Sequence, residues 1–251
     1  MFTKVKTPQE IIWMRESGQM LATVLEASVK HAAVGMTTKE LADFASAETK
    51  KLGAIPAFLG QYGFPDVMCI SVNQAVVHGL PGKYVLKDGD IVSLDFGIKH
   101  QGMITDAART IIVGNTNKAK QKLIDTTRAS LDEGIEVIAD GVFVGDIAHA
   151  VQGVLDSAGL GIVRDLVGHG VGHQLHEDPN IPNYGRAGTG PQLKAGMTIA
   201  VEPMATLGSY QVYTAQDDWT IETRDGSLAA HFEDTILITK NGYEILTRTQ
   251  G

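Results

Sequence analysis

The stretch "GMTTKELADFASAETKKLGA", residues 35–54, recurs in a related form as "GVFVGDIAHAVQGVLDSAGL", residues 141–160. In both stretches apolar residues recur at helical spacing, and a glycine near the end signals where a helix stops. Each is followed by a second matching segment, "LKDGDIVSLDFG" (residues 86–97) and "LKAGMTIAVEPM" (residues 193–204), so that Asp95 aligns with Glu202. Unless these glycines and Leu-Lys turns coincide by chance, the repetition predicts one domain, residues 1–251, of two duplicated halves of about 8–114 and 115–248.

Start and stop signals divide the chain into helices and strands. Thr7 with Glu10, and Thr37 with Glu40, form capping-box patterns. Helices are predicted over about residues 7–33, 37–53, 117–139 and 145–158. Apolar alternating segments predict strands at residues 67–73, 90–97, 103–113, 197–204 and 234–246. Helices followed by strands, twice over, indicate the α+β class.

Composition excludes several functional classes. The chain has 251 residues, 43% of them hydrophobic, and no segment has the uninterrupted apolar length of a membrane span. Its first residues, "MFTKVKTPQEIIWMRESG", have no apolar core of signal-peptide length, which predicts a cytoplasmic protein. A net charge of −8 without a basic run argues against nucleic acid as a partner. The single cysteine, Cys69, excludes an intrachain disulfide and a thiolate metal cluster.

Four carboxylates lie on or beside the predicted apolar strands. In "DIVSLDFGIKHQGMITDAART", residues 90–110, a hairpin turning around residues 99–102 would place Asp95 directly opposite Asp106. Like charges so placed are destabilising, but a divalent cation between them reverses the sign. Glu202 and Glu233 flank apolar strands in the same way. Two solvated aspartates on an exposed face are the ordinary alternative, but the apolar neighbours favour a site for two divalent ions about 3.5 to 4 Å apart.

The stretch "LVGHGVGHQLHEDPNIP", residues 166–182, contains three histidines, His169, His173 and His176. On a helix they would share one face. The interspersed glycines make a helix unfavourable, at a cost of about 1 kcal/mol for each glycine relative to alanine. We therefore expect a glycine-rich loop in which the backbone aims each ring separately, so that the three histidines have different roles.

Six motifs in order carry a resemblance to a known family: "VVHGLPG", "SLDFG", "ITDAART", "GHGVGHQLHEDP", "VEPM" and "HFEDT". With them the chain resembles the type I methionine aminopeptidases, over about residues 7–247. The resemblance implies a pita-bread α+β fold, in which a curved antiparallel sheet carries two helix pairs related by a pseudo-two-fold axis. It also implies a hydrolase, a metalloprotease that removes N-terminal methionine during protein maturation when the second residue is small.

The resemblance assigns the metal ligands, which would be Asp95, Asp106, His169, Glu202 and Glu233. They would hold two divalent ions, which could be Co, Mn, Fe, Zn or Ni, because such a donor set accepts several first-row metals. Asp106 and Glu233 would bridge the two ions. A hydroxide bridging the ions would attack the scissile carbonyl.

Other candidate residues would act on the substrate. Glu202 would also shuttle the proton, His176 would stabilise the carbonyl oxygen, and His78 would contact the nitrogen side of the scissile bond. His173 matches no catalytic position. The remaining histidines, His31, His100, His149 and His231, are expected to be structural or exposed.

The methionine side chain would occupy an apolar pocket in which Phe64, Cys69 and Trp219 fit the family pattern. At three other pocket positions the sequence departs from it. Many bacterial members have tyrosine where this chain has Gln61, cysteine where it has Phe58 and phenylalanine where it has Leu175. These departures leave the reaction class unchanged but put the shape of the pocket in doubt.

Two alternatives remain beside this interpretation. Aminopeptidases and dipeptidases that cleave X-Pro bonds share the fold and the five ligands, although they usually carry an extra N-terminal domain. A metal-free binding module of the same fold would lack ligands that are all present here. The expected partners are the N-termini of nascent polypeptides, at the ribosome in particular, for a monomer that needs neither nucleic acid nor a membrane.

Overall fold

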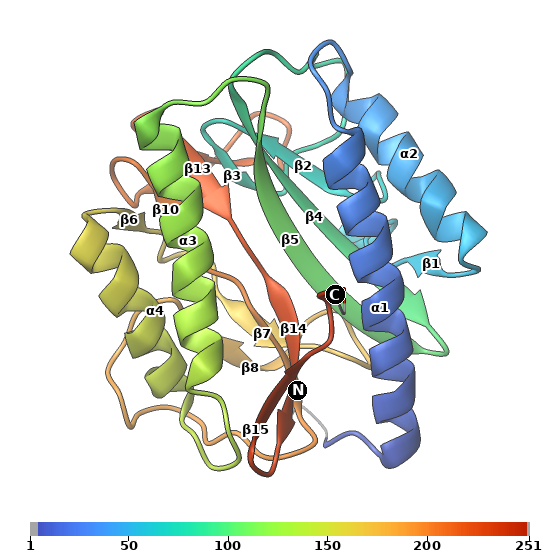
Figure 1. Ribbon diagram of the computed structural model, residues 1–251, viewed down its shortest axis with the longest axis vertical. Coiled ribbons are helices and arrows are strands. Elements are labelled where there is room, and N and C mark those ends of the chain that lie inside the picture. Colours follow the sequence, from blue (N-terminus) through green and yellow to red (C-terminus); the bar gives the residue numbers. More distant parts are fainter. Residues whose placement is uncertain (1–4, 250–251) are drawn as a thin grey trace.

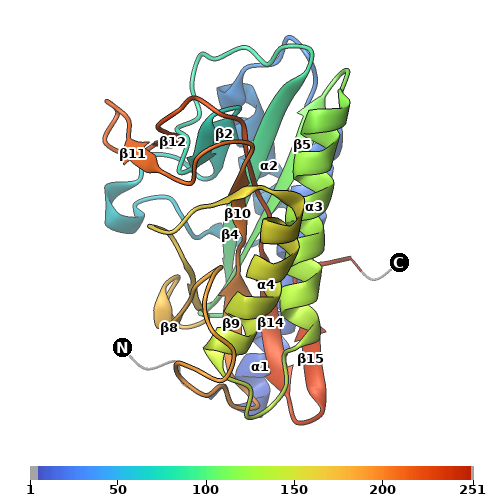
Figure 2. The same cartoon turned by 90° about the vertical axis from the view of Figure 1, so that its left-hand side faces the viewer.

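The computed structural model describes residues 5–249, and four long helices form one layer of it (Figures 1 and 2). They are α1 (Pro8–His31), α2 (Thr38–Lys51), α3 (Lys118–Glu136) and α4 (Val144–Ala158). All four predicted helices are confirmed to within a few residues, and both predicted capping boxes form. None of the helices within residues 5–249 is long and apolar enough to cross a membrane.

Strands form the layer beneath the helices, and every strand pair within the described residues is antiparallel. In chain order they are β1 (Ile55–Pro56), β2 (Cys69–Val72), β3 (Ala75–Val77), β4 (Asp90–His100), β5 (Met103–Val113), β6 (Gly161–Ile162), β7 (Gly168–Gly170), β8 (Glu177–Ile181), β9 (Thr198–Val201), β10 (Met204–Thr206), β11 (Val212–Thr214), β12 (Ile221–Thr223), β13 (Ala229–His231), β14 (Asp234–Thr239) and β15 (Gly242–Ile245). A 3-10 turn, η1, covers Gln61–Gly63. The five predicted strand segments are present, and the α+β class is confirmed.

The predicted segment at residues 197–204 is two strands instead of one. β9 ends at Val201 and β10 begins at Met204, with Glu202 and Pro203 between them. Proline has no N–H to contribute to a ladder, so it favours a break at this point. The break leaves Glu202 between two strands that belong to different ladders.

The long hairpin of β4 and β5 corrects one prediction. It turns at Gln101 and Gly102, which both have positive φ as a two-residue turn requires. His100 therefore pairs with Met103, and this register places Asp106 opposite Gly97 and Asp95 opposite Ala108. The prediction that Asp95 lies directly opposite Asp106 was wrong, because a turn around residues 99–102 implies a register displaced by two residues. The aspartates are instead diagonal neighbours on one face of the hairpin.

Two hydrophobic clusters attach the helix pairs to the strands. One packs Leu21, Leu25 and Leu41 of α1 and α2 against Leu94 and Phe96 of β4. The other packs α3 and α4, through Leu131, Ile147 and Val151, against strands of the second half, through Ile199 of β9 and Ile236 of β14. The strands of the two sides meet where Glu233 and Ala108 exchange backbone hydrogen bonds of 3.1 and 3.2 Å. The helices therefore cover one face, and the other face is free to form a site (Figure 2).

Candidate metal centre and active site

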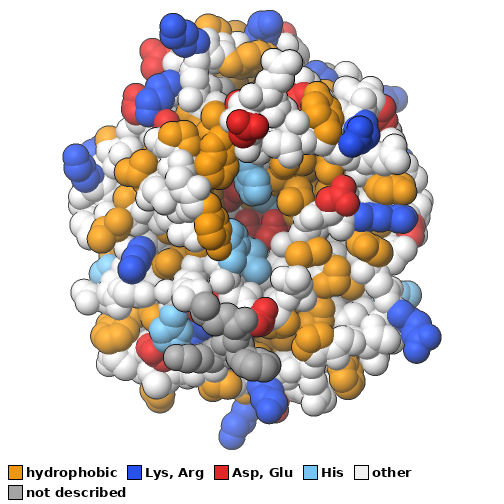
Figure 3. Space-filling model, turned by 180° about the vertical axis from the view of Figure 1, so that it is seen from behind, with side chains coloured by type: hydrophobic (Ala, Val, Ile, Leu, Met, Phe, Trp, Pro, Cys, Tyr) orange, Lys and Arg blue, Asp and Glu red, His pale blue; other side chains and the backbone are white. Residues whose placement is uncertain are grey.

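A cavity of about 460 Å³ opens on the face opposite the helices, with acidic side chains and histidines at its base (Figure 3). It brings together every candidate residue named from the sequence. Those lining it are Phe58, Gln61, Phe64, Cys69, His78, Asp95, Asp106, His169, Leu175, His176, Glu202, Trp219 and Glu233. Residues far apart in the chain therefore meet in one site.

The hairpin of β4 and β5 supplies two aspartates to the base of the cavity. Asp95 pairs with Cys69 of β2, and Asp106 lies on the neighbouring strand opposite Gly97. A Cβ atom at Gly97 would lie 2.8 Å from the ring of Phe58, which is closer than real contacts allow. Glycine at this position therefore lets the apolar wall of the cavity approach the strand that carries Asp95.

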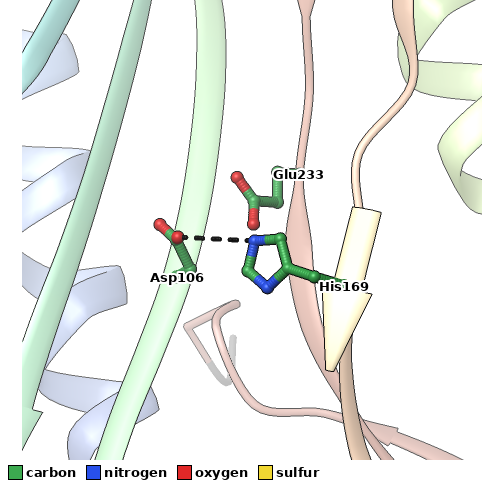
Figure 4. A group of neighbouring side chains, drawn as sticks. All are labelled: Asp106, His169 and Glu233. Atoms are coloured by element: carbon green, nitrogen blue, oxygen red, sulfur yellow. Dashed lines mark ion pairs between the residues drawn. The ribbon is translucent and has the colours of Figure 1, made fainter. Parts of the chain in front are cut away.

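Glu233 is held against Asp106 by contacts between their strands. Thr235 of β14 accepts the N–H of Asp106 at 2.9 Å and donates its hydroxyl to the carbonyl oxygen of Asp106 at 2.8 Å. The bridge between Glu233 and Ala108 fixes the same crossing. As a result, ligand atoms of Asp106, His169 and Glu233 all lie within 4.8 Å of one another (Figure 4).

His169 has the tautomer that metal binding requires. Its Nδ1 lies 2.9 Å from the carbonyl oxygen of Gly170, which can only accept, so Nδ1 carries the proton and Nε2 has a free lone pair. Nε2 lies 3.5 Å from Glu202 and 4.0 Å from Asp106. Burial lowers the pKa of His169 to about 3, so that the ring is neutral at physiological pH.

The pKa values of the four carboxylates are all raised. Burial raises the pKa of Asp106 to about 7. Burial, followed by repulsion from the other carboxylates, also raises the pKa values of Asp95, Glu202 and Glu233 well above their usual range. One buried oxygen each of Asp95, Asp106 and Glu233 has no hydrogen-bond partner within residues 5–249. Unpartnered buried oxygens that repel one another fit a cluster of divalent cations, because cations would supply both the missing contacts and the missing positive charge.

Sequence reasoning missed His231, which was expected to be structural or exposed. It is almost fully buried, with Nε2 3.4 Å from Glu202 and 3.8 Å from Glu233. Thr110 fixes its backbone, accepting the N–H at 2.9 Å and donating to the carbonyl oxygen at 2.6 Å. The signal was strand periodicity: His231 stands two residues before Glu233 and so shares its face. Glu202, His231 and Glu233 form a second group that could contact a cation.

His78 and His176 lie beside the carboxylates rather than among them. His78 follows β3 in the left-handed region, with a φ of 58° that is uncommon for a residue other than glycine. The ring of His176 packs edge-on to that of His169, with centroids 4.5 Å apart, and lies parallel to the ring of Tyr62, with centroids 6.0 Å apart. Desolvation lowers the pKa values of both His78 and His176. Both rings are therefore neutral hydrogen-bond donors at physiological pH.

Apolar side chains form one end of the cavity. Phe64 contacts Phe58 and Trp219 edge to face, at centroid distances of 6.5 and 5.2 Å. Cys69 and Leu175 belong to the same cluster. Burial raises the pKa of the Cys69 thiol, so that it is an uncharged pocket residue. Gln61 joins the lining from η1.

The other histidines lie outside the lining that the described residues form. His31 stacks on Phe44, His100 pairs with Glu16, and His149 is exposed. His173 lies next to the cavity but its ring points to the start of α1, where Nε2 is 2.8 Å from Glu10.

Comparisons with known proteins agree on the identity of this arrangement. The model of metallopeptidase family M24 matches residues 13–240. The chain is 48% identical to a methionine aminopeptidase of Clostridium perfringens, over 97% of this chain and 98% of that protein. The crystal structure of a methionine aminopeptidase from Thermotoga maritima superimposes with a TM-score of 0.97 at 46% identity, covering 99% of this chain and all of that one. A prolidase from Pyrococcus horikoshii superimposes with a TM-score of 0.80 at 25% identity, and only 64% of its length is covered.

Proposed function

The chain belongs to metallopeptidase family M24, and from this premise we propose that it is a methionine aminopeptidase. It is a metal-dependent hydrolase that removes the N-terminal methionine from polypeptides. The fold is the pita-bread fold that methionine aminopeptidases and prolidases share. An X-Pro peptidase is the less favoured alternative, because the prolidase is less identical to this chain and much of its length lies outside the match.

One observation supports the assignment of roles: four carboxylates, three histidines with lowered pKa values and an apolar pocket line a single cavity. We assign the metal ligands as Asp95, Asp106, His169, Glu202 and Glu233. Their charges, and the unpartnered oxygens of Asp95, Asp106 and Glu233, favour two divalent ions, which Asp106 and Glu233 would share. The donor set leaves the identity of the metal to cellular supply.

Bound divalent ions would activate water as a nucleophile and polarise the scissile carbonyl. Glu202 is assigned as the proton carrier, because a carboxylate beside the ions would lie within reach of both the activated water and the departing amine. His176 donates a hydrogen bond to the carbonyl oxygen as negative charge develops on it. His78 contacts the nitrogen side of the scissile bond.

The apolar end of the cavity holds the methionine side chain. Phe64 and Trp219 close this end, and Phe58, Cys69 and Leu175 complete the walls. Burying an unbranched side chain among aromatic rings is favourable, and sulfur makes additional attractive contacts with their edges. Gln61 gives the pocket one polar group that could shift its tolerance for residues close to methionine in size.

The substrate test compares peptides that differ at the second residue. Val77, Leu166 and Met204 line the cavity near His78, so a large second side chain has little room. With each of Mn, Fe, Co and Zn restored in turn to metal-stripped protein, we expect kcat/KM to be far higher for Met-Ala-Ser than for Met-Lys-Ser. A formylated methionine should not be cleaved. Comparable kcat/KM values for the two peptides would contradict the assignment, and cleavage of Ala-Pro peptides instead would favour the X-Pro alternative.

Metal binding should depend on pH in a defined direction. The ligands must be deprotonated to bind a cation, yet in the metal-free protein burial raises the pKa of Asp106 to about 7. Metal affinity is therefore expected to increase as the pH rises through about 7, with protons released on binding. His169 should contribute no proton at this pH, because burial has lowered its pKa to about 3. Titration calorimetry in buffers of different ionisation enthalpy measures the release, and proton uptake would have the wrong sign.

Several broader features belong to the same proposal. The helix pairs and the aligned carboxylates support one catalytic domain of two duplicated halves, about 8–114 and 115–248. The single cysteine suits the cytoplasm, where nascent chains at the ribosome would present their N-termini to a monomeric enzyme.

A further inference from the structure

The segment before α1 lies against the loop that carries His176, residues 171–177, which we call the histidine loop. The N–H of Lys6 donates to the carbonyl oxygen of Gly196 at 2.8 Å. Its side chain then passes Gly172, where a Cβ atom would lie only 2.4 Å from Lys6 Cε. Lys6 Nζ reaches Glu177 Oε2 at 2.9 Å, and both side chains are almost fully buried. Lys6 and Glu177 therefore form a buried ion pair although they lie far apart in the sequence.

Glu177 also closes the turn of the histidine loop. Its Oε1 accepts the backbone N–H of His173 at 2.7 Å and that of Gln174 at 3.1 Å. One carboxylate thus holds the backbone on the amino-terminal side of His176 while Lys6 balances its charge. Removing one partner of such a pair leaves a buried charge without compensation, which is strongly unfavourable.

A second contact joins the histidine loop to the first turn of α1. Glu10 Oε1 lies 2.8 Å from His173 Nε2, while Glu10 Oε2 accepts the N–H of Thr7 at 2.7 Å in the capping box. Both hydrogen bonds, that of the Thr7 backbone first, lower the pKa of Glu10 to about 2, so the carboxylate is charged at physiological pH. Glu10 therefore caps a helix and holds the loop at the same time.

The histidine loop carries two groups of the proposed active site. Leu175 contributes to the apolar pocket and His176 to the space beside His169. The start of the loop is tied to the strands, because Ile104 donates its N–H to the carbonyl oxygen of Gly172 at 2.7 Å. The loop ends at Glu177, the first residue of β8, whose backbone pairs with Gly170 of β7. Between these two anchored ends, the side chains of Lys6 and Glu10 contact the loop through Glu177 and His173.

We propose that Lys6, Glu10, His173 and Glu177 form a clamp that sets the position of His176. These are positioning residues, and the inference rests on the proposed function because it assumes that His176 acts on the substrate. The strength of a hydrogen bond made only in the transition state is sensitive to small displacements of its donor. Loss of the clamp should therefore lower kcat more than it raises KM, without loss of metal.

The chain offers a matched control for Glu10. Glu40 forms the same capping box with Thr37 at the start of α2, but its contacts stay within that helix start. We expect Glu10→Ala and Glu40→Ala to lower the melting temperature to a similar extent. Only Glu10→Ala should lower kcat for Met-Ala-Ser, about tenfold, with the metal content unchanged. Equal kcat values for the two variants would overturn the clamp.

The buried pair is tested by a double-mutant cycle. Lys6→Met and Glu177→Gln should each reduce kcat at least as much as Glu10→Ala, because each removes one member of the buried ion pair. The double variant should recover part of kcat, since the glutamine still accepts N–H groups and neither charge remains. Losses that simply multiply in the double variant would contradict the coupling of Lys6 and Glu177.

Ring nitrogen NMR signals of the histidines supply a readout that needs no turnover. In Glu10→Ala the signals of His176 should shift, whereas in Glu40→Ala they should match the parent protein. Unchanged His176 signals in Glu10→Ala would overturn the clamp even if kcat fell. If the parent protein cleaves no methionyl peptide with any metal, the proposed function fails, yet these spectra still report whether the clamp holds the loop.

Discussion

Asp106→Ala is expected to abolish turnover of Met-Ala-Ser and to remove most of the bound metal. Asp106, His169 and Glu233 have ligand atoms close enough to hold one cation together. We assign Asp106 as a ligand of both ions. Its removal deletes a ligand from each ion and leaves the remaining donors too few. Metal stoichiometry and kcat of the purified variant measure both effects. Asp95→Ala should differ, because Asp95 is assigned to one ion only and chiefly that ion should be weakened.

Asp90 is the control for this experiment. It is also buried on β4, but its oxygens accept hydrogen bonds from Asn73, Tyr84 and the N–H of Lys87. Asp90→Asn should lower the melting temperature while the folded protein keeps its metal and kcat. An Asp106→Ala protein that retains two ions and cleaves Met-Ala-Ser would refute the ligand assignment.

His176→Ala is expected to lower kcat by about 10² to 10³, the cost of removing one donor to a developing oxyanion, or roughly 3 to 4 kcal/mol. The metal content should stay unchanged, because His176 is assigned to the substrate. His169→Ala should instead lose metal and activity together, as removal of a ligand does. Measuring both quantities at saturating metal separates the two histidines. A fully active His176→Ala would show that the donor to the carbonyl oxygen is another group.

Local signals were sufficient for the helices but not for the register of the hairpin. Capping boxes at Thr7 and Thr37 depend on neighbours three residues away, which the sequence displays directly. The β4–β5 register depends instead on which residues form the turn. The Gln101-Gly102 pair, with two positive φ values, places the turn one residue further along the chain than predicted, so Asp106 lies opposite Gly97 and not opposite Asp95.

The candidate site was predictable where motifs carried it and not elsewhere. The five proposed ligands and the two substrate histidines all stand in recognisable motifs, and all of them line one cavity. His231 opens the motif "HFEDT" that also carries Glu233, but the resemblance assigned no role to this histidine. The clamp contacts join residues separated by 171 and 163 positions, and nothing in the sequence near Lys6 or Glu10 indicates a partner so distant.

The origin of the proposed ligands has a thermodynamic consequence. Asp95 and Asp106 come from one hairpin, whereas His169 comes from β7, Glu202 from the break between β9 and β10, and Glu233 from the break between β13 and β14, all much later in the chain. Ions shared between them would act as a non-covalent cross-link, and they would close a long loop of chain in a protein whose one cysteine cannot form an internal disulfide. Because a ligand that binds only the folded state adds stability in proportion to the logarithm of its free concentration, the folding equilibrium would follow the supply of metal. The ions that take part in the reaction would thus also stabilise the folded state against unfolding.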